Sequence, residues 1–167
     1  MTGTVTVWTL EMTEPSAVRP SRELARRPLL MRADRPAPQL SRFFYELVGG
    51  PWHWVERLVW TERQWQDWVE VSELWTCWLD GAPAGYAELH PQGRDVELAY
   101  FGLVPQRCGS GLGGWLLTRA LQRAWRLPGT RRVWVHTCSL DAPAALPNYE
   151  ARGFVRCGET TEANGAP

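Results

Sequence analysis

Four glycines and a serine lie at one junction of the chain, in the segment PQRCGSGLGGWLL at residues 105–117. A strand-like stretch, RDVELAYFGLV at 94–104, precedes this segment, and apolar residues recur at helical spacing from Leu112 to Trp125. Glycines let a ligand approach the backbone closely, and the first N–H groups of a helix have no partner within it. The junction therefore predicts an anion-binding turn at a helix start, where the helix dipole also favours negative charge.

Two common phosphate-binding motifs do not fit this junction. Gly109, Gly111 and Gly114 satisfy G-x-G-x-x-G, but the strand does not run straight into them. About 20 residues after Gly114, where that motif needs an acidic residue, the chain has Trp134–His136. No Gly-Lys-Ser/Thr follows, as a Walker loop requires. A glycine-rich helix start that serves only close packing stays open as the structural alternative.

The elements around the junction predict a mixed α/β domain. Strands are predicted at 4–10, 74–80, 84–91, 94–104 and 131–138 and from Phe154 onward, and helices at 112–127 and from about Ala144 to Gly153. The turns after 74–80 and 84–91, at Gly81–Pro83 and Gln92–Gly93, are short. Strands joined by such short turns pair antiparallel, so the middle of the chain is expected to be a three-stranded meander.

The first half of the chain is less regular. Prolines and arginines in residues 15–39 predict an irregular segment with a short helix near SRELARR, at 21–27. Two or three helices are expected between Leu40 and Val71: one with Ser41 as cap and Gly49 as stop, another capped by Thr61. Tryptophans gather from Trp52 to Trp78, either as packing residues or as walls of an acceptor pocket.

Composition excludes several classes of protein. The 167 residues fit a single domain, and 18 basic residues, all arginine, balance 18 acidic ones, so neither a nucleic-acid nor a membrane partner is expected. Four scattered cysteines without a C-x-x-C pair indicate free thiols and no metal site. With neither a signal-like N-terminus nor a long apolar run, a cytoplasmic protein is expected.

The order strand, R/Q-x-x-G-x-G/A-like loop, helix, strand and a helix ending in Y-x-x-x-G-F resembles the GNAT superfamily of acyl-CoA-dependent N-acyltransferases. The resemblance is clearest over 74–158, and it implies one GNAT domain over 1–167 with a frayed tail at 160–167. It implies a central mixed, mostly antiparallel sheet flanked by helices, with a splay between the strands at 94–104 and 131–138. In this family that splay holds the pantetheine arm of coenzyme A, while the glycine loop grips its pyrophosphate.

Two registers of the family motif fit the loop. CGSGLG makes Gly111 and Gly113 the key glycines and places Cys108 where the family usually has Arg or Gln. QRCGSG places Gln106 there, with Gly109 and Gly111 as the glycines. The first register suits the following helix better, and because the grip is largely through backbone N–H groups, a cysteine should weaken binding rather than abolish it.

A second departure lies before the last helix, where Ala142 replaces the asparagine of many members and Asp141 or Asn148 could substitute for it. The resemblance implies that a backbone N–H at Leu103 or Val104 polarises the thioester carbonyl. The cofactor-binding residues that it implies are Leu103, Val104, Cys108, Gly109, Ser110, Gly111, Leu112, Gly113 and Asn148.

Two side chains carry the proton transfers that acyl transfer to an amine needs. By resemblance, Glu97, on the strand before the loop, is the general base; Glu88 is the reserve, followed by His136 and His90. Tyr149 matches the tyrosine that many members use to protonate the departing thiolate. No metal is required by this chemistry.

The expected function is an N-acetyltransferase that moves the acetyl group of acetyl-CoA to a primary amine by direct attack in a ternary complex. The acceptor is expected to be a small molecule or a peptide amine, and a homodimer is left open. A non-catalytic GNAT-like module that binds acyl-CoA or a partner is the first alternative. A tryptophan-rich interaction domain with an empty glycine loop is the second.

Overall fold

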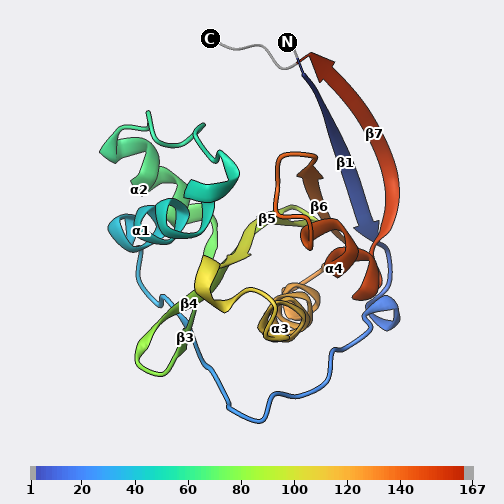
Figure 1. Ribbon diagram of the computed structural model, residues 1–167, viewed down its shortest axis with the longest axis horizontal. Helices are drawn as coiled ribbons and strands as arrows, with labels where there is room; N and C mark the ends of the chain where they lie inside the picture. Colours follow the sequence, from blue (N-terminus) through green and yellow to red (C-terminus); the bar gives the residue numbers. More distant parts are fainter. Residues whose placement is uncertain (1–2, 164–167) are drawn as a thin grey trace.

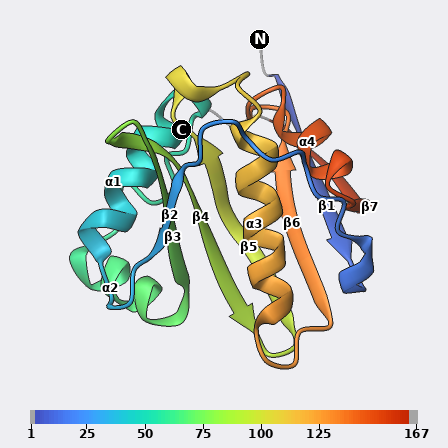
Figure 2. The same ribbon diagram turned by 90° about the horizontal axis from the view of Figure 1, so that it is seen from below.

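The computed structural model describes residues 3–163, which form one seven-stranded sheet with helices on both faces (Figure 1). The strands are β1 (Thr4–Met12), β2 (Leu29–Arg32), β3 (Glu73–Leu79), β4 (Ala82–Gln92), β5 (Asp95–Leu103), β6 (Arg132–Cys138) and β7 (Val155–Ala163). Their spatial order is β2-β3-β4-β5-β6-β1-β7. The helices are α1 (Pro38–Gly49), α2 (Glu62–Val71), α3 (Leu112–Arg126) and α4 (Ala145–Ala151). Helices α1 and α2 cover one face and α3 and α4 the other (Figure 2).

The central meander is confirmed. β3 pairs antiparallel with β4, and β4 with β5, through turns in which Asp80, Gly81 and Gly93 have φ of 56°, 77° and 68°. The first turn lies at Asp80–Gly81, because β4 already begins at Ala82. With antiparallel pairs at β2–β3, β1–β6 and β1–β7 and one parallel pair, the sheet is mixed and mostly antiparallel, as expected.

The expected splay between β5 and β6 is also confirmed. These parallel strands pair only at Asp95–Glu97 with Arg132–Trp134, after which each continues without the other. Helix α3 makes the crossover between them, as parallel neighbours require. Its buried face, including Leu117, Leu121 and Ala124, packs on the sheet and holds the two strands in one core.

The other face of the sheet carries a smaller core. Phe44 and Val48 of α1 pack on Tyr86 of β4 and on Leu74 of β3. Gly102 of β5 allows this close seating, because a Cβ there would lie 2.5 Å from Val48 Cγ1. The end of α1 is therefore fixed against the open part of β5.

The prediction of a short helix near 21–27 is wrong. Residues 18–28 instead run extended across α3 (Figure 2), where the Ser21 N–H donates to Thr118 Oγ1 at 3.0 Å and Trp115 Nε1 donates to Glu23. Side-chain hydrogen bonds to α3 thus replace the internal bonds of a helix. The short strand β2, which pairs with β3, was missed because four residues carry no readable alternation.

Two more expectations at element ends were wrong. Helix α1 begins at Pro38 with Ala37 as N-cap, and Ser41 is not a cap, because its hydroxyl lies buried and donates to Glu88. The tail is paired as far as Ala163 in β7, so residues 160–163 are not frayed; 164–167 lie outside the described residues. The cap at Thr61 is confirmed, with a full capping box.

Over residues 3–163, none of the helices combines the length and the apolar character that crossing a bilayer requires. Within the same range, no cluster of three or more histidine, cysteine or acidic side chains could hold a metal ion.

Candidate active site

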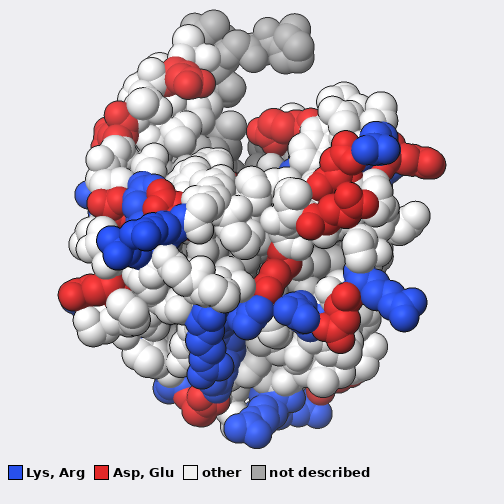
Figure 3. Space-filling view, turned by 180° about the vertical axis from the view of Figure 1, so that it is seen from behind, with Lys and Arg blue, Asp and Glu red and all other residues white. Residues whose placement is uncertain are grey.

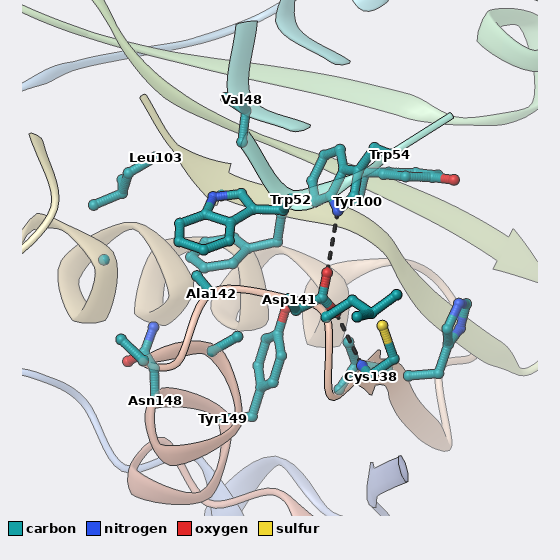
Figure 4. Close-up of a pocket in the computed structure, with 18 of the residues that line it drawn as sticks. Val48, Trp52, Trp54, Tyr100, Leu103, Cys138, Asp141, Ala142, Asn148 and Tyr149 are labelled. Carbon is teal, nitrogen blue, oxygen red and sulfur yellow. Dashed lines mark hydrogen bonds between the residues drawn. The ribbon is translucent and has the colours of Figure 1, made fainter. Parts of the chain in front are cut away.

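A cavity of about 670 Å³ fills the splay between β5 and β6 (Figure 4). Its walls come from β5, β6, the glycine loop, the loop between β6 and α4, the start of α4, the link from α1 to α2, and the ends of β1 and β7. This volume lies in the usual range for small-molecule sites, about 300–1,000 Å³. The missing strand pairing is thus what creates the site.

The glycine loop forms one end of the cavity. Gly109 and Gly111 have φ of 81° and 82°, the left-handed region that glycine adopts without strain. Gly111 is the N-cap of α3, and the first bond of the helix runs from the Trp115 N–H to the Gly111 carbonyl. The N–H groups of residues 109–114 donate to no other group within 3–163. Such a row of free donors at a helix start is suited to bind an anion such as a pyrophosphate.

Most of the expected cofactor residues lie at the cavity. The lining contains Leu103, Cys108, Gly109, Gly111, Gly113 and Asn148, whereas Val104, Ser110 and Leu112 do not line it. Leu112 is buried in the core, and the Ser110 hydroxyl donates to the Arg107 carbonyl at 2.7 Å. Position 113 opens directly into the site, because a Cβ there would lie 3.6 Å from Asn148 Nδ2 and from Leu103 Cδ1.

Of the two backbone groups expected to face a thioester, only one is free for that purpose. The Val104 N–H donates to the Ala84 carbonyl at 2.9 Å, on the β4 side. Successive N–H groups of a strand point to opposite edges. The Leu103 N–H therefore points toward the splay.

Tyr149 of α4 lies in the cavity with its phenol directed toward Asp141 (Figure 4). Only 5% of the residue is exposed. Burial, and then the charge of Asp141, raises the pKa of the phenol above its ordinary value. The hydroxyl therefore stays protonated at any physiological pH and can donate a proton.

A hydrogen bond between Trp54 and Asp141 connects two walls of the cavity and could not be inferred from any local sequence pattern. Trp54 Nε1, from the α1–α2 link, donates to Asp141 Oδ1 at 3.1 Å. The other oxygen of Asp141 accepts from the Cys138 N–H at 3.0 Å (Figure 4). The same oxygen also accepts from Thr137 Oγ1 at 2.7 Å. Asp141 thus secures the loop after β6 rather than capping α4, whose N-cap is Ala144.

The candidate bases lie in different places. Glu97 does not line the cavity, but its carboxylate lies 3.6 Å from Nδ1 of both His136 and His90, and His136 does line it. Glu88 does not line the cavity; it is fully buried, lies opposite Tyr100 in the β4–β5 pairing and is ion-paired with Arg57. Glu97 thus reaches the site only through His136.

The end of the cavity opposite the glycine loop is formed by Trp52, His53, Trp54 and Glu56 of the α1–α2 link, with Val5 and Val7 of β1 and Glu162 of β7. Trp52 and Trp54 agree with the interpretation of the tryptophans as pocket walls, whereas the other five residues were missed. Because side chains alternate along a strand, Val7 of β1 and His136 of β6 lie on the sheet face opposite to α3. The cavity therefore passes through the sheet, with the glycine loop at one mouth and this second group at the other.

Comparison with known proteins identifies the family. The sheet is split and mixed, and the crossover helix α3 starts at a glycine-rich loop. A model of the acetyltransferase (GNAT) family matches residues 39–154. The chain belongs to the GNAT acetyltransferase family, and the resemblance seen in the sequence is confirmed.

Solved structures agree on the fold. The chain is similar to a GCN5-related N-acetyltransferase from Kribbella flavida, with a TM-score of 0.66 and 16% identity over 97% of this chain and 59% of that one. For a tandem GNAT protein from the clavulanic acid biosynthesis pathway, the TM-score is 0.61 and the identity 17%, over 97% of this chain and 54% of that one. For a GNAT-family acetyltransferase from Streptococcus pneumoniae, the TM-score is 0.57 and the identity 15%, over 77% of this chain and 88% of that one. The chain spans less than two thirds of the first two structures. No curated protein sequence matches it.

Proposed function

We propose that the protein is an N-acetyltransferase that moves the acetyl group of acetyl-CoA to a primary amine in a ternary complex. The family supports the reaction type. The observation that carries the proposal is that free N–H groups of residues 109–114 and the Tyr149 phenol belong to the same through-sheet cavity. An anion site for one substrate and a proton donor for the leaving group are thus within reach of a second substrate at the other mouth.

Acetyl-CoA supplies the activated acyl group as a thioester. In the overall reaction an ammonium group and the thioester give an amide, a free thiol and one proton, so a C–N bond forms and a C–S bond breaks without any redox step. The chain's part is to hold the pyrophosphate at residues 109–114, to donate a hydrogen bond from the Leu103 N–H, and to give a proton from Tyr149. Glu97 withdraws the amine proton by way of His136, whose ring lies between it and the cavity.

The first expected result concerns coenzyme binding. A protein with leucine at position 113 should still fold, because the position lies in α3 and a Cβ there would have its nearest neighbours at 3.6 Å. The leucine side chain would, however, enter the cavity. Gly113→Leu should lower the affinity for acetyl-CoA by about 100-fold or more in isothermal titration. Gly158→Leu on the edge strand β7, whose Cβ would meet Thr9 at 3.5 Å, is the matched control and should bind normally. Wild-type protein that does not bind acetyl-CoA would refute the proposal.

The second expected result concerns the leaving group. Tyr149→Phe should lower kcat for thiol release by about 100-fold with little change in the KM for acetyl-CoA, since it removes a proton transfer but not the binding loop. Tyr86→Phe is the control, because the Tyr86 hydroxyl is buried, has no partner within 3–163 and lies outside the cavity. Equal rates for the two variants would remove Tyr149 from the mechanism.

Binding without turnover would favour the alternative, a non-catalytic acyl-CoA-binding module. Such a module would also be indifferent to Glu97→Gln, whereas an enzyme with Glu97 behind His136 would lose rate. Thiol release across a panel of primary amines separates the two.

A further inference from the structure

Acidic groups dominate the second mouth of the cavity. Its ionisable lining includes Glu56, Asp141 and Glu162, whereas no arginine lines the cavity among the described residues and the chain has no lysine. Figure 3 shows a notch in this face with acidic side chains on both sides of it, while the larger groups of arginines lie lower down. At this mouth the described lining holds no arginine, so a bound anionic group would have only the histidines His53 and His136 beside it.

Glu56 is held in a fixed position by a buried tyrosine. The Tyr45 hydroxyl donates to Glu56 Oε2 at 3.3 Å and accepts from the Arg57 N–H at 3.2 Å. Tyr45 itself is fully buried beneath Trp54 and Tyr100. Glu56 forms no ion pair within residues 3–163, so its charge is not neutralised by the protein.

The nearest cation is turned away from this carboxylate. Arg57 follows Glu56 in the chain, but its side chain is 5% exposed and pairs with Glu88 at 3.2 Å. Its guanidinium also lies over the rings of Trp68 and Tyr100, at 4.0 Å from each centroid. Arg57 is thus enclosed and neutralised, and it leaves the negative charge of Glu56 facing the cavity.

The effect of this charge extends across the cavity. Burial is the main cause of the raised pKa of both Cys138 and Tyr100; the charge of Glu56 adds to the rise at both, although at Tyr100 the opposing charge of Arg57 has the larger effect. Both residues line the cavity from the opposite strands β6 and β5. A cation in this space would be stabilised by the same charge.

Aromatic rings complete this half of the cavity. Trp52, Trp54 and Tyr100 line it, and the rings of Trp54 and Tyr100 meet edge to face at 4.9 Å (Figure 4). Ammonium groups are attracted to aromatic faces, most strongly to tryptophan, and apolar carbon packs on the same rings.

We propose that the acceptor is a small cationic amine without any carboxylate or phosphate, with its ammonium group at Glu56 and its carbon chain against Trp52 and Trp54. The inference rests on the proposed acetyl transfer and adds the chemical class of the acceptor. An α-amino acid or a phosphorylated amine is disfavoured, because its anion would lie beside the negative charges of Glu56 and Glu162 with no arginine to pair with it.

Matched pairs that differ by one carboxylate test this directly. 2-Phenylethylamine is compared with phenylalanine, and 1,4-diaminobutane with ornithine, by thiol release with acetyl-CoA and by calorimetric titration into protein saturated with coenzyme A. The amine of at least one pair should exceed its amino acid by about 30-fold or more in kcat/KM and in affinity. Amino acids that match or exceed both amines, or a failure of both amines to bind, would overturn the inference.

Charge variants at one position assign the selectivity. Glu56→Gln should lower the affinity for the preferred amine by about 10-fold or more, and Glu56→Arg should shift the preference toward the amino acid of the pair. Glu14→Gln, an exposed carboxylate outside the cavity, should change neither.

The two proposals fail in different ways. Amine binding that depends on Glu56 without thiol release would refute acetyl transfer and keep the cation site. Thiol release that is unaffected by Glu56→Gln or by an added carboxylate would keep acetyl transfer and refute the acceptor class.

Discussion

Glu88→Ala should lower the free energy of unfolding by about 3–5 kcal/mol, because it leaves a buried guanidinium without its counter-charge. Glu88 is 0% exposed, accepts from Ser41 Oγ at 2.8 Å and from Arg57 Nη1 at 3.2 Å, and also accepts from Trp68 Nε1. Its carboxylate therefore joins β4 to α1, to α2 and to the link that carries Glu56. Urea unfolding followed by far-ultraviolet circular dichroism measures the loss.

Two controls separate this cause from a general effect of removing a charge. Asp67→Ala breaks the surface ion pair between Arg63 and Asp67, whose side chains are 82% and 53% exposed, respectively. It should lower the free energy of unfolding by at most about 0.5 kcal/mol. The double replacement Glu88→Leu with Arg57→Met should recover much of the loss, since no charge is left buried. A loss for Glu88→Ala no larger than for Asp67→Ala would contradict the structural role given to this pair.

Stability should begin to fall at the pH where tyrosines ordinarily ionise, and the protein should unfold cooperatively at a higher pH. All four tyrosines, Tyr45, Tyr86, Tyr100 and Tyr149, have a raised pKa, chiefly because burial disfavours the phenolate. Below about pH 10 both folded and unfolded chains keep these protons and the full stability is present. Above it the unfolded chain binds fewer protons, so stability falls by up to about 1.4 kcal/mol per pH unit for each tyrosine.

Ultraviolet absorbance of tyrosinate against pH checks this expectation. The folded protein should show little phenolate at about pH 10.5, where free tyrosine is mostly ionised, and the signal should rise together with the loss of circular dichroism. Tyr86→Phe should make the loss of stability less steep by about one proton. A tyrosine that titrates at its ordinary pKa in the folded state would show that its ring is open to water.

The sequence carried enough local information to predict the second half of the fold. Short turns at Gly81 and Gly93 force neighbouring strands to pair, and the glycines from Gly109 to Gly114 mark a helix start whose N–H groups are free. Tyr149 was assigned from the family resemblance, through its spacing to Gly153, and it lines the cavity. Its proposed role still awaits the kinetics described above.

The other half of the site depends on contacts between distant parts of the chain. Trp54 and Asp141 are separated by 87 positions, and Ser41 and Glu88 by 47, so no local pattern links them. Ser41 looked like a helix cap because serine favours that position, but a buried carboxylate is a stronger partner for its hydroxyl. Glu56 had no distinguishing neighbour in the sequence, and only the turning away of Arg57 sets it apart.

The short pairing between β5 and β6 also affects the mechanics of the domain. The sheet consists of two half-sheets that share three residue pairs at one end, and the Trp54–Asp141 hydrogen bond links them across the other end. A ligand bound in the cavity as proposed would contact both halves, where β5 and β6 form no hydrogen bonds to each other. Its binding energy adds directly to folding stability, about 2.7 kcal/mol at a ligand concentration 100 times Kd. The two half-sheets should therefore move least relative to each other when a ligand is bound between them.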